Sequence, residues 1–171
     1  YSHRIKKLLF IGNLTSAFLS VLPFFAILLY YKNFYEVILG HAAFLFILLM
    51  IREMIKDLEN IKGDLANDYI TIPILYGEDV SKKIITFLTI STIVPVYVLI
   101  EIFDVGYMDI YFYCCLIILI FFLQYLWKSS TKQQYILLHN VLKFLIVAGV
   151  FSIILINPSV LWHGKILLQS I

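Results

Sequence analysis

The segment Arg52–Pro73 reads REMIKDLENIKGDLANDYITIP and follows directly on a long apolar run. It contains five of the eleven acidic residues of the chain, which are Glu53, Asp57, Glu59, Asp64 and Asp68. Charged residues are sparse elsewhere, because 62% of the 171 residues are hydrophobic. The acids therefore gather at the edge of an apolar segment, and this segment is the candidate functional site.

The composition predicts a membrane protein. A mean hydropathy of +0.95 and a hydrophobic fraction of 62% exceed the values of soluble domains. A helix needs about 20 apolar residues to cross a bilayer, and continuous runs of that length favour helices over the alternating segments of a β-barrel. We predict an all-α, polytopic membrane helical bundle with about five transmembrane helices, over Leu8–Tyr31, Tyr35–Ile55, Ile84–Phe103, Ile110–Trp127 and Ile136–Ile156.

We expect residues 1–171 to form a single membrane domain with a polar connector at about 56–83. The second helix is expected to extend past the membrane surface to about Lys62, followed by a loop or short helix. No cleavable signal peptide is evident after the first basic cluster. Because the chain begins with Tyr1 and enters a span at once, an N-terminal part is expected to be missing. Cys114 and Cys115 point to different helix faces and are expected to serve packing.

The basic residues predict the orientation in the membrane. Most of them fall on one side of the five spans: Arg4, Lys6, Lys7, Arg52, Lys56, Lys62, Lys82, Lys83, Lys128 and Lys132. The other side has only Lys32 and Lys165. By the positive-inside rule the basic side is cytoplasmic. The acidic segment is therefore expected to face the cytoplasm, in what we expect to be a cell inner membrane.

The spacing of the polar residues predicts a cation site. Around a helix of about 100° per residue, Glu53, Asp57, Asn60 and Asp64 fall within a sector of about 60°. Their oxygens repel one another unless a cation or water compensates. Hard oxygen ligands suit Mg²⁺, which uses one or two carboxylates while it holds the phosphates of a substrate. Asp57, Asn60 and Asp64 are the candidate metal ligands.

The alternative is a solvated helix end, where charges of both signs are ordinary. The clustering on one face and the membrane context favour a site. Basic residues flank the same helix at Arg52, Lys56 and Lys62. Asn13 lies in the first span, where an amide is costly in lipid, so it should face the bundle.

The segment resembles the second Asp-rich motif of the UbiA superfamily of intramembrane prenyltransferases, which reads approximately R-E-x-x-K-D-x-E-D-x-x-G-D, followed by T-L-P and a further Gly. The matching residues are Arg52, Glu53, Lys56, Asp57, Glu59, Asn60, Gly63, Asp64, Thr71, Ile72, Pro73 and Gly77. The opening YSHRIKKLLFIGN also resembles a family segment and supplies Tyr1, Lys6, Lys7, Gly12 and Asn13. The pattern is most similar to the geranylgeranylglycerol-phosphate geranylgeranyltransferase-like branch. Two positions differ: Asn60 stands where Asp is usual, and Asp68 stands where Gly is common.

The resemblance implies a Mg²⁺-dependent enzyme that transfers a prenyl group from a prenyl diphosphate to a lipid or aromatic acceptor. Asp57 and Asp64 would be catalytic, and the substrate would contact Asn13, Arg52, Lys56, Lys6 and Lys7. The expected partners are these substrates and membrane lipids, with no nucleic acid. The chain resembles only the C-terminal half of the family. The first Asp-rich motif, N-x-x-x-D-x-x-x-D, is therefore expected on a helix before Tyr1.

Other polar residues are expected to have structural roles. His41 should be hydrogen-bonded within the second span, and His139, Asn140 and Lys143 could face the cavity or anchor the fifth span at the interface. Pro23 and Pro95 are expected to kink their helices.

Two other classes of protein remain as alternatives. A non-catalytic membrane subunit or transporter fragment would carry buried charges in several spans, and the span centres here are nearly free of them. A CDP-alcohol phosphotransferase would carry a D-G-x-x-A-R motif, which is absent. The acceptor and the prenyl chain length are not defined by the sequence.

Overall fold

The computed structural model describes residues 11–31 and 36–152, and every regular element in that part of the chain is helical. The α-helices are α2 (Ile11–Tyr31), α3 (Glu36–Glu59), α4 (Ile61–Ala66), α5 (Ile72–Ser91), α6 (Ile93–Tyr97), α7 (Asp109–Lys128) and α8 (Lys132–Ser152). A π-helix, η1 (Val98–Ile102), follows α6, and a 3₁₀ turn, η2 (Gly106–Met108), precedes α7. The predicted all-α helical bundle is confirmed.

Four helical stretches in the described residues are long and apolar enough to cross a membrane. They are Glu36–Glu59, Ile72–Ile102, Gly106–Lys128 and Lys132–Ser152, and they correspond to the second to fifth predicted spans. The first predicted span, Leu8–Tyr31, corresponds to α2, whose first described residue is Ile11. Its residues before Ile11, and the end of the fifth predicted span after Ser152, lie outside the described residues.

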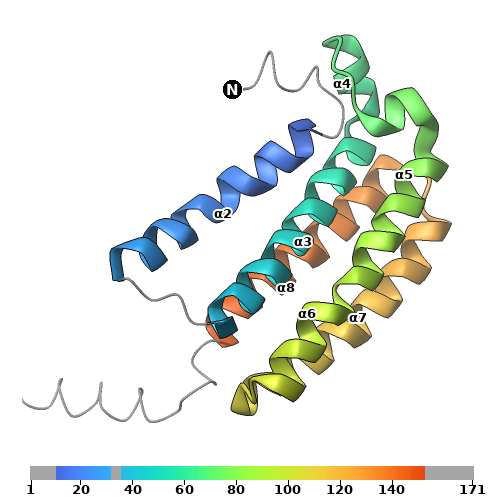
Figure 1. Cartoon of the computed structure of the whole chain (residues 1–171). Coiled ribbons are helices and arrows are strands. Elements are labelled where there is room, and N and C mark those ends of the chain that lie inside the picture. The colour runs from blue at the N-terminus through green and yellow to red at the C-terminus, as the bar shows by residue number, and fades with distance from the viewer. Residues whose placement is uncertain (1–10, 32–35, 153–171) are drawn as a thin grey trace, which may run out of the picture.

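Helix α3 is the centre of the bundle (Figure 1). It packs against α2 on one side, α5 and α6 on another, and α8 behind it. Its C-terminal half is therefore buried around most of its circumference, and Ile51, Met54 and Ile55 are at most 1% exposed. Because lipid is as apolar as these side chains, close packing rather than burial from water holds such helices together. The C-terminal end of α3 is consequently held in place by the neighbouring helices.

The third span begins earlier than predicted. Sequence analysis placed its start at Ile84, whereas α5 starts at Ile72, inside the expected connector. Gly77 interrupts α5 with a φ of 85°, a left-handed conformation that glycine adopts without strain. Pro95 lacks the N–H that would bond to the carbonyl of Ser91, and the helix breaks nearby at Thr92, as expected of this proline. Pro23, in contrast, lies inside α2, which continues through it as one element.

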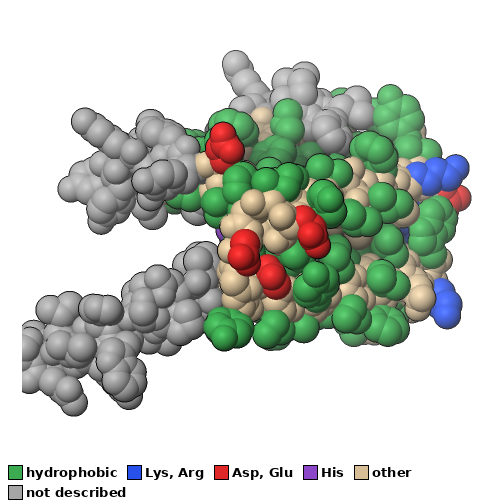
Figure 2. Space-filling view, turned by 60° about the horizontal axis from the view of Figure 1, so that its bottom comes forward, with side chains coloured by type: hydrophobic (Ala, Val, Ile, Leu, Met, Phe, Trp, Pro, Cys, Tyr) green, Lys and Arg blue, Asp and Glu red, His purple; other side chains and the backbone are tan. Residues whose placement is uncertain are grey.

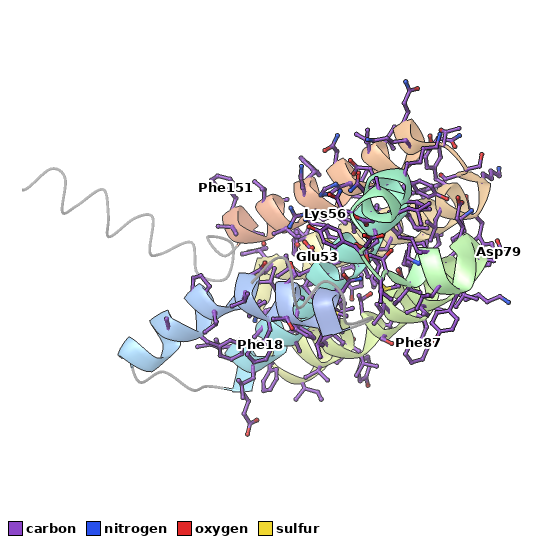
Figure 3. The ribbon with its side chains drawn as sticks, turned by 90° about the horizontal axis from the view of Figure 1, so that it is seen from above. Phe18, Glu53, Lys56, Asp79, Phe87 and Phe151 are labelled. Atoms are coloured by element: carbon purple, nitrogen blue, oxygen red, sulfur yellow. The ribbon has the colours of Figure 1, made fainter. Side chains whose placement is uncertain are left out.

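The outward surface of the bundle is apolar, as a lipid-facing surface must be. Figure 3, a view onto the α4 end, shows Phe87 and Phe151 at the periphery and Glu53 and Lys56 on α3. Phe87 and Phe151 are 70% and 67% exposed.

The two ends of the bundle differ in charge. Glu36, Glu101 and Asp104 are exposed at the end opposite to α4. Figure 2 shows acidic side chains gathered on that end, with the visible lysine and arginine side chains at the far edge. The predicted orientation rests on the basic residues, and Lys56, Lys62, Lys83, Lys128 and Lys132 belong to the elements at the α4 end.

Candidate functional site

The site begins at the C-terminal end of α3, where the helix stops at Glu59, one residue before Asn60. Sequence analysis predicted a continuous helix to about Lys62. Instead α3 ends at Glu59, Asn60 takes a φ of −114° and a ψ of 20°, and α4 starts at Ile61. Two backbone bonds span the break, from Asn60 N–H to the Lys56 carbonyl (3.1 Å) and from Asp64 N–H to the Asn60 carbonyl (2.9 Å). The chain therefore keeps its helical sense through the bend.

A polar cavity of about 90 Å³ lies beside this bend. It is lined by Gly12, Asn13, Ser16, Glu53, Lys56, Asp57, Asn60, Asp64, Ile70, Thr71 and Ile72. The four residues that the helical spacing placed on one face thus line one cavity. Its wall is completed by α2 and by the chain that enters α5. Asp57 and Asp64 are 7% and 2% exposed, so their carboxylates are largely removed from bulk water.

Amide groups hold both carboxylates. Asn13 Nδ2 donates to Asp57 Oδ2 at 2.6 Å, across the contact between α2 and α3. Asn60 Nδ2 donates to Asp64 Oδ1 at 3.0 Å, across the bend. The expectation that Asn13 faces the bundle is confirmed. A buried carboxylate is costly without such donors, so these bonds lower the cost of placing two acids together.

Gly63 makes room for the Asn60 side chain. A Cβ atom at this glycine would lie 2.6 Å from Asn60 Oδ1 and 2.9 Å from Nδ2. These distances are shorter than van der Waals contact, so the amide would have to move. The glycine therefore leaves room for the Asn60 amide in the position from which it donates to Asp64.

Among the described residues, Lys56 is the basic residue that lines the cavity. Its Nζ lies 3.5 Å from Glu53 Oε2, and its side chain is 46% exposed. An exposed pair of this kind contributes little stability, so the ammonium group can turn to an anion in the cavity at small cost. Lys6 and Lys7, which were also predicted to bind substrate, lie outside the described residues.

Arg52 does not line the cavity, although sequence analysis assigned it to the substrate. Its Nε donates to His139 Nε2 on α8 at 3.1 Å, and its Nη1 lies 3.7 Å from Glu53 Oε1. Because His139 Nε2 accepts a hydrogen bond, the ring proton is on Nδ1, which lies 2.9 Å from Glu59 Oε2. Arg52, His139 and Glu59 therefore form a chain of hydrogen bonds that ties the end of α3 to α8. His139 does not line the cavity, and this link between helices is a role that sequence analysis did not consider.

Lys82 also turns inward. It is 6% exposed, and its Nζ donates to the carbonyl of Ser129 at 2.6 Å, in the turn between α7 and α8. The sequence placed this lysine on the basic side of the membrane without assigning it a partner. His41, at the other end of α3, hydrogen-bonds to the carbonyl of Val37 (2.7 Å) and packs against Phe112, as expected for a packing residue.

The donor set of the cavity fits Mg²⁺. The cavity offers carboxylates from Asp57 and Asp64 and the amide oxygen of Asn60, which are hard ligands. A carboxylate has enough lone pairs to accept an amide N–H and also bind a metal ion. No cluster of three His, Cys, Asp or Glu side chains able to hold a metal occurs within residues 11–31 and 36–152. Mg²⁺ keeps waters and needs only one or two protein carboxylates when a substrate supplies phosphate oxygens.

Asp68 does not join this set. The spacing N-x-x-x-D-x-x-x-D of the first family motif also occurs in this chain, at Asn60, Asp64 and Asp68, where it overlaps the second motif. Asp68 follows the end of α4, has a φ of 53°, and is exposed. Because the helix has already ended, a residue four positions after Asp64 does not stack on it.

Apart from Gly12 and Asn13, sequence reasoning assigned no role to the cavity residues that come from outside α3 and α4. Ser16 lies three residues after Asn13 on α2, so a helical-wheel view of that span would have found it. Thr71 belongs to the quoted motif but received no role. Ile70 and Ile72 carry no polar signal that a sequence could reveal.

Comparisons with known proteins place the chain in a family. A sequence model of the UbiA prenyltransferase family matches residues 1–143. A digeranylgeranylglyceryl phosphate synthase of Methanosphaera stadtmanae is 37% identical over 113 residues, which are 64% of this chain and 41% of that protein. The synthases of the same name from Methanothermobacter thermautotrophicus and Thermococcus sibiricus are 34% and 33% identical. They match 64% and 55% of this chain, and 40% and 33% of their own lengths.

The chain thus spans well under half the length of these relatives. No solved structure matches the chain at a comparable level of significance. The family match, in contrast, covers most of the sequence and includes every residue of the cavity. The chain belongs to the UbiA prenyltransferase family.

Proposed function

We propose that the chain is part of a membrane prenyltransferase that transfers a prenyl group from a prenyl diphosphate to a lipid acceptor with the help of Mg²⁺. The observation that carries the proposal is the cavity where Asp57 and Asp64, each held by an amide, meet at the end of the central helix. Membership of the family supplies the reaction class.

Each residue of the cavity has a role in the proposal. Asp57 and Asp64 bind the metal ion, with the oxygen of Asn60 as a further ligand. Asn13 orients Asp57 through its hydrogen bond. Lys56 binds the diphosphate, and we propose the same role for Lys6 and Lys7. Arg52 is assigned to the link with His139 instead of the substrate, because of its hydrogen bond to that ring.

In the proposed reaction the bond between the first prenyl carbon and the bridging oxygen breaks, and the electron pair leaves with the diphosphate. A nucleophilic atom of the acceptor bonds to that carbon and loses its proton to the medium. The metal ion, when bound, would stabilise negative charge on the departing diphosphate. Lys56 adds a positive charge at the same place, so stabilisation grows as the bond breaks.

The names of the relatives favour a glycerol-phosphate lipid as the acceptor over an aromatic one. We also propose that the α4 end of the bundle faces the cytoplasm, because Lys56, Lys62, Lys83, Lys128 and Lys132 lie there and the opposite end is acidic. As a single acidic cavity provides only one side of a metal clamp, we propose that a second Asp-rich segment completes the catalytic unit.

The test replaces Asp64 by Asn, which removes a charge and keeps the volume. The chain is co-expressed with a segment that bears the first Asp-rich motif, and Mg²⁺-dependent release of diphosphate from geranylgeranyl diphosphate is measured in detergent with a glycerol-phosphate lipid. This release should fall at least about a hundredfold in the variant. Asp104→Asn is the matched control, because Asp104 is exposed at the acidic end and asparagine tolerates its φ of 46°. Unchanged activity in Asp64→Asn would refute the proposed function.

A further inference from the structure

Thr71 is a buried residue of the cavity whose side chain has no hydrogen-bond partner among the described residues. It is 8% exposed, and its Oγ1 is among the buried side-chain atoms without a hydrogen bond in the described part of the chain. It lines the same cavity as Asp57 and Asp64, but it comes from the chain between α4 and α5. A buried hydroxyl without a partner costs free energy, so its presence calls for an explanation.

The local sequence explains why the hydroxyl lacks its usual partner at the start of α5. Thr71 is the N-cap residue of α5, and an N-cap hydroxyl normally accepts a bond from the second or third residue of the helix. The second residue is Pro73, which has no N–H. The third is Ile74, whose N–H donates to the backbone carbonyl of Thr71 (3.2 Å). The sequence Thr71-Ile72-Pro73 therefore leaves the hydroxyl without its usual capping bond.

A group of this kind suits the recognition of an anion. The cavity wall around it already holds Asp64 and the amide of Asn60, which accept or donate within the chain. A hydroxyl can donate its proton while its oxygen accepts, and bonds to charged acceptors are the stronger ones. The cavity is thus lined by residues of α2, by residues of α3 and α4, and by the segment before α5 that carries Thr71.

We propose that the Thr71 hydroxyl donates a hydrogen bond to a phosphate oxygen of the diphosphate substrate in this cavity. Thr71 is then a substrate-binding residue, distinct from the metal-binding carboxylates. The inference rests on the proposed function, because it requires that a diphosphate occupy the cavity.

The experiment measures the binding of inorganic diphosphate, in the presence of Mg²⁺, to the purified chain in detergent by titration calorimetry. Thr71→Val replaces the hydroxyl by a methyl group of similar size, and Thr71→Ser keeps the hydroxyl. Thr71→Val should weaken binding roughly ten- to a hundredfold, as for a lost bond to a charged group. Thr71→Ser should bind within about threefold of the wild type.

A stability measurement separates binding from folding. Because the hydroxyl makes no bond within residues 11–31 and 36–152, Thr71→Val without ligand should unfold at the same temperature as the wild type or higher. A lower unfolding temperature together with unchanged binding would mean that the hydroxyl is structural, and would overturn the inference.

Further measurements distinguish a failure of this inference from a failure of the proposed function. If Asp64→Asn loses binding and Thr71→Val does not, the role of Thr71 is refuted and the proposed function stands. If Thr71→Val weakens the binding of Mg²⁺ alone as much as that of Mg²⁺ with diphosphate, the assignment to a phosphate oxygen is wrong. If the wild-type chain binds no diphosphate, the proposed function fails and the inference fails with it.

Discussion

Replacing Gly63 by Ala should separate the function of the site from the stability of the fold. The added Cβ would lie 2.6 Å from Asn60 Oδ1, so the Asn60 amide must move away. The amide currently donates to Asp64 at 3.0 Å, and its displacement breaks that bond. Asp64 would then lose the group that orients it, while the backbone of α4 is undisturbed.

The two effects on stability oppose each other. Alanine is favoured over glycine in a helix by about 1 kcal/mol. The lost bond to a charged acceptor contributes about 1.5 kcal/mol, less for an exposed partner such as Asn60. The net change in the free energy of unfolding should therefore be within about 1 kcal/mol. The affinity for Mg²⁺-diphosphate should fall about tenfold, as is typical when a group that orients a metal ligand is lost.

A double-mutant cycle is the decisive assay. In Asn60→Ala the side chain that clashes is absent, so adding Gly63→Ala should not weaken diphosphate binding further. Calorimetric titration of the four proteins gives the coupling, and thermal unfolding gives the stability. If Gly63→Ala lowers the affinity tenfold in both backgrounds, the steric reasoning is refuted.

Three further predictions concern the surroundings of the site. His139→Leu should lower the free energy of unfolding by about 1 to 3 kcal/mol in a denaturant titration, since it leaves Arg52 and Glu59 without their shared partner; equal stability would show that the link contributes nothing. The 171 residues alone should bind diphosphate but not turn over, and release of product should require co-expression with a segment bearing the first Asp-rich motif; turnover by the isolated chain would show that one motif suffices. A cysteine at position 62 should react with a membrane-impermeant reagent only from the cytoplasmic side, and labelling only from the other side would reverse the proposed orientation.

The acidic face could be predicted because its cause is local. Spacings of three and four stack side chains on any helix, so Glu53, Asp57 and Asp64 converge even though α3 stops at Glu59. Asn13 was predictable for a different reason: an amide in an apolar span must find a partner, and Asp57 is that partner.

The features that were missed depend on contacts distant in sequence. Arg52 turns to His139, which lies 87 residues away, and no local pattern identifies that pairing. The early start of α5 at Ile72 was missed because residues up to Lys83 were assigned to a polar connector with a loop or short helix. The unpaired hydroxyl of Thr71 follows from Pro73 only once the start of that helix is known.

The central claim is that Asp57 and Asp64 hold a divalent cation together with a diphosphate. The most direct measurement is a crystal structure with Mn²⁺ and diphosphate, in which anomalous scattering locates the metal ion. The account predicts a peak about 2.0–2.2 Å from oxygens of Asp57 and Asp64. A peak elsewhere, such as beside Glu101 and Asp104 at the acidic end, or no peak in the cavity with diphosphate bound, would contradict it.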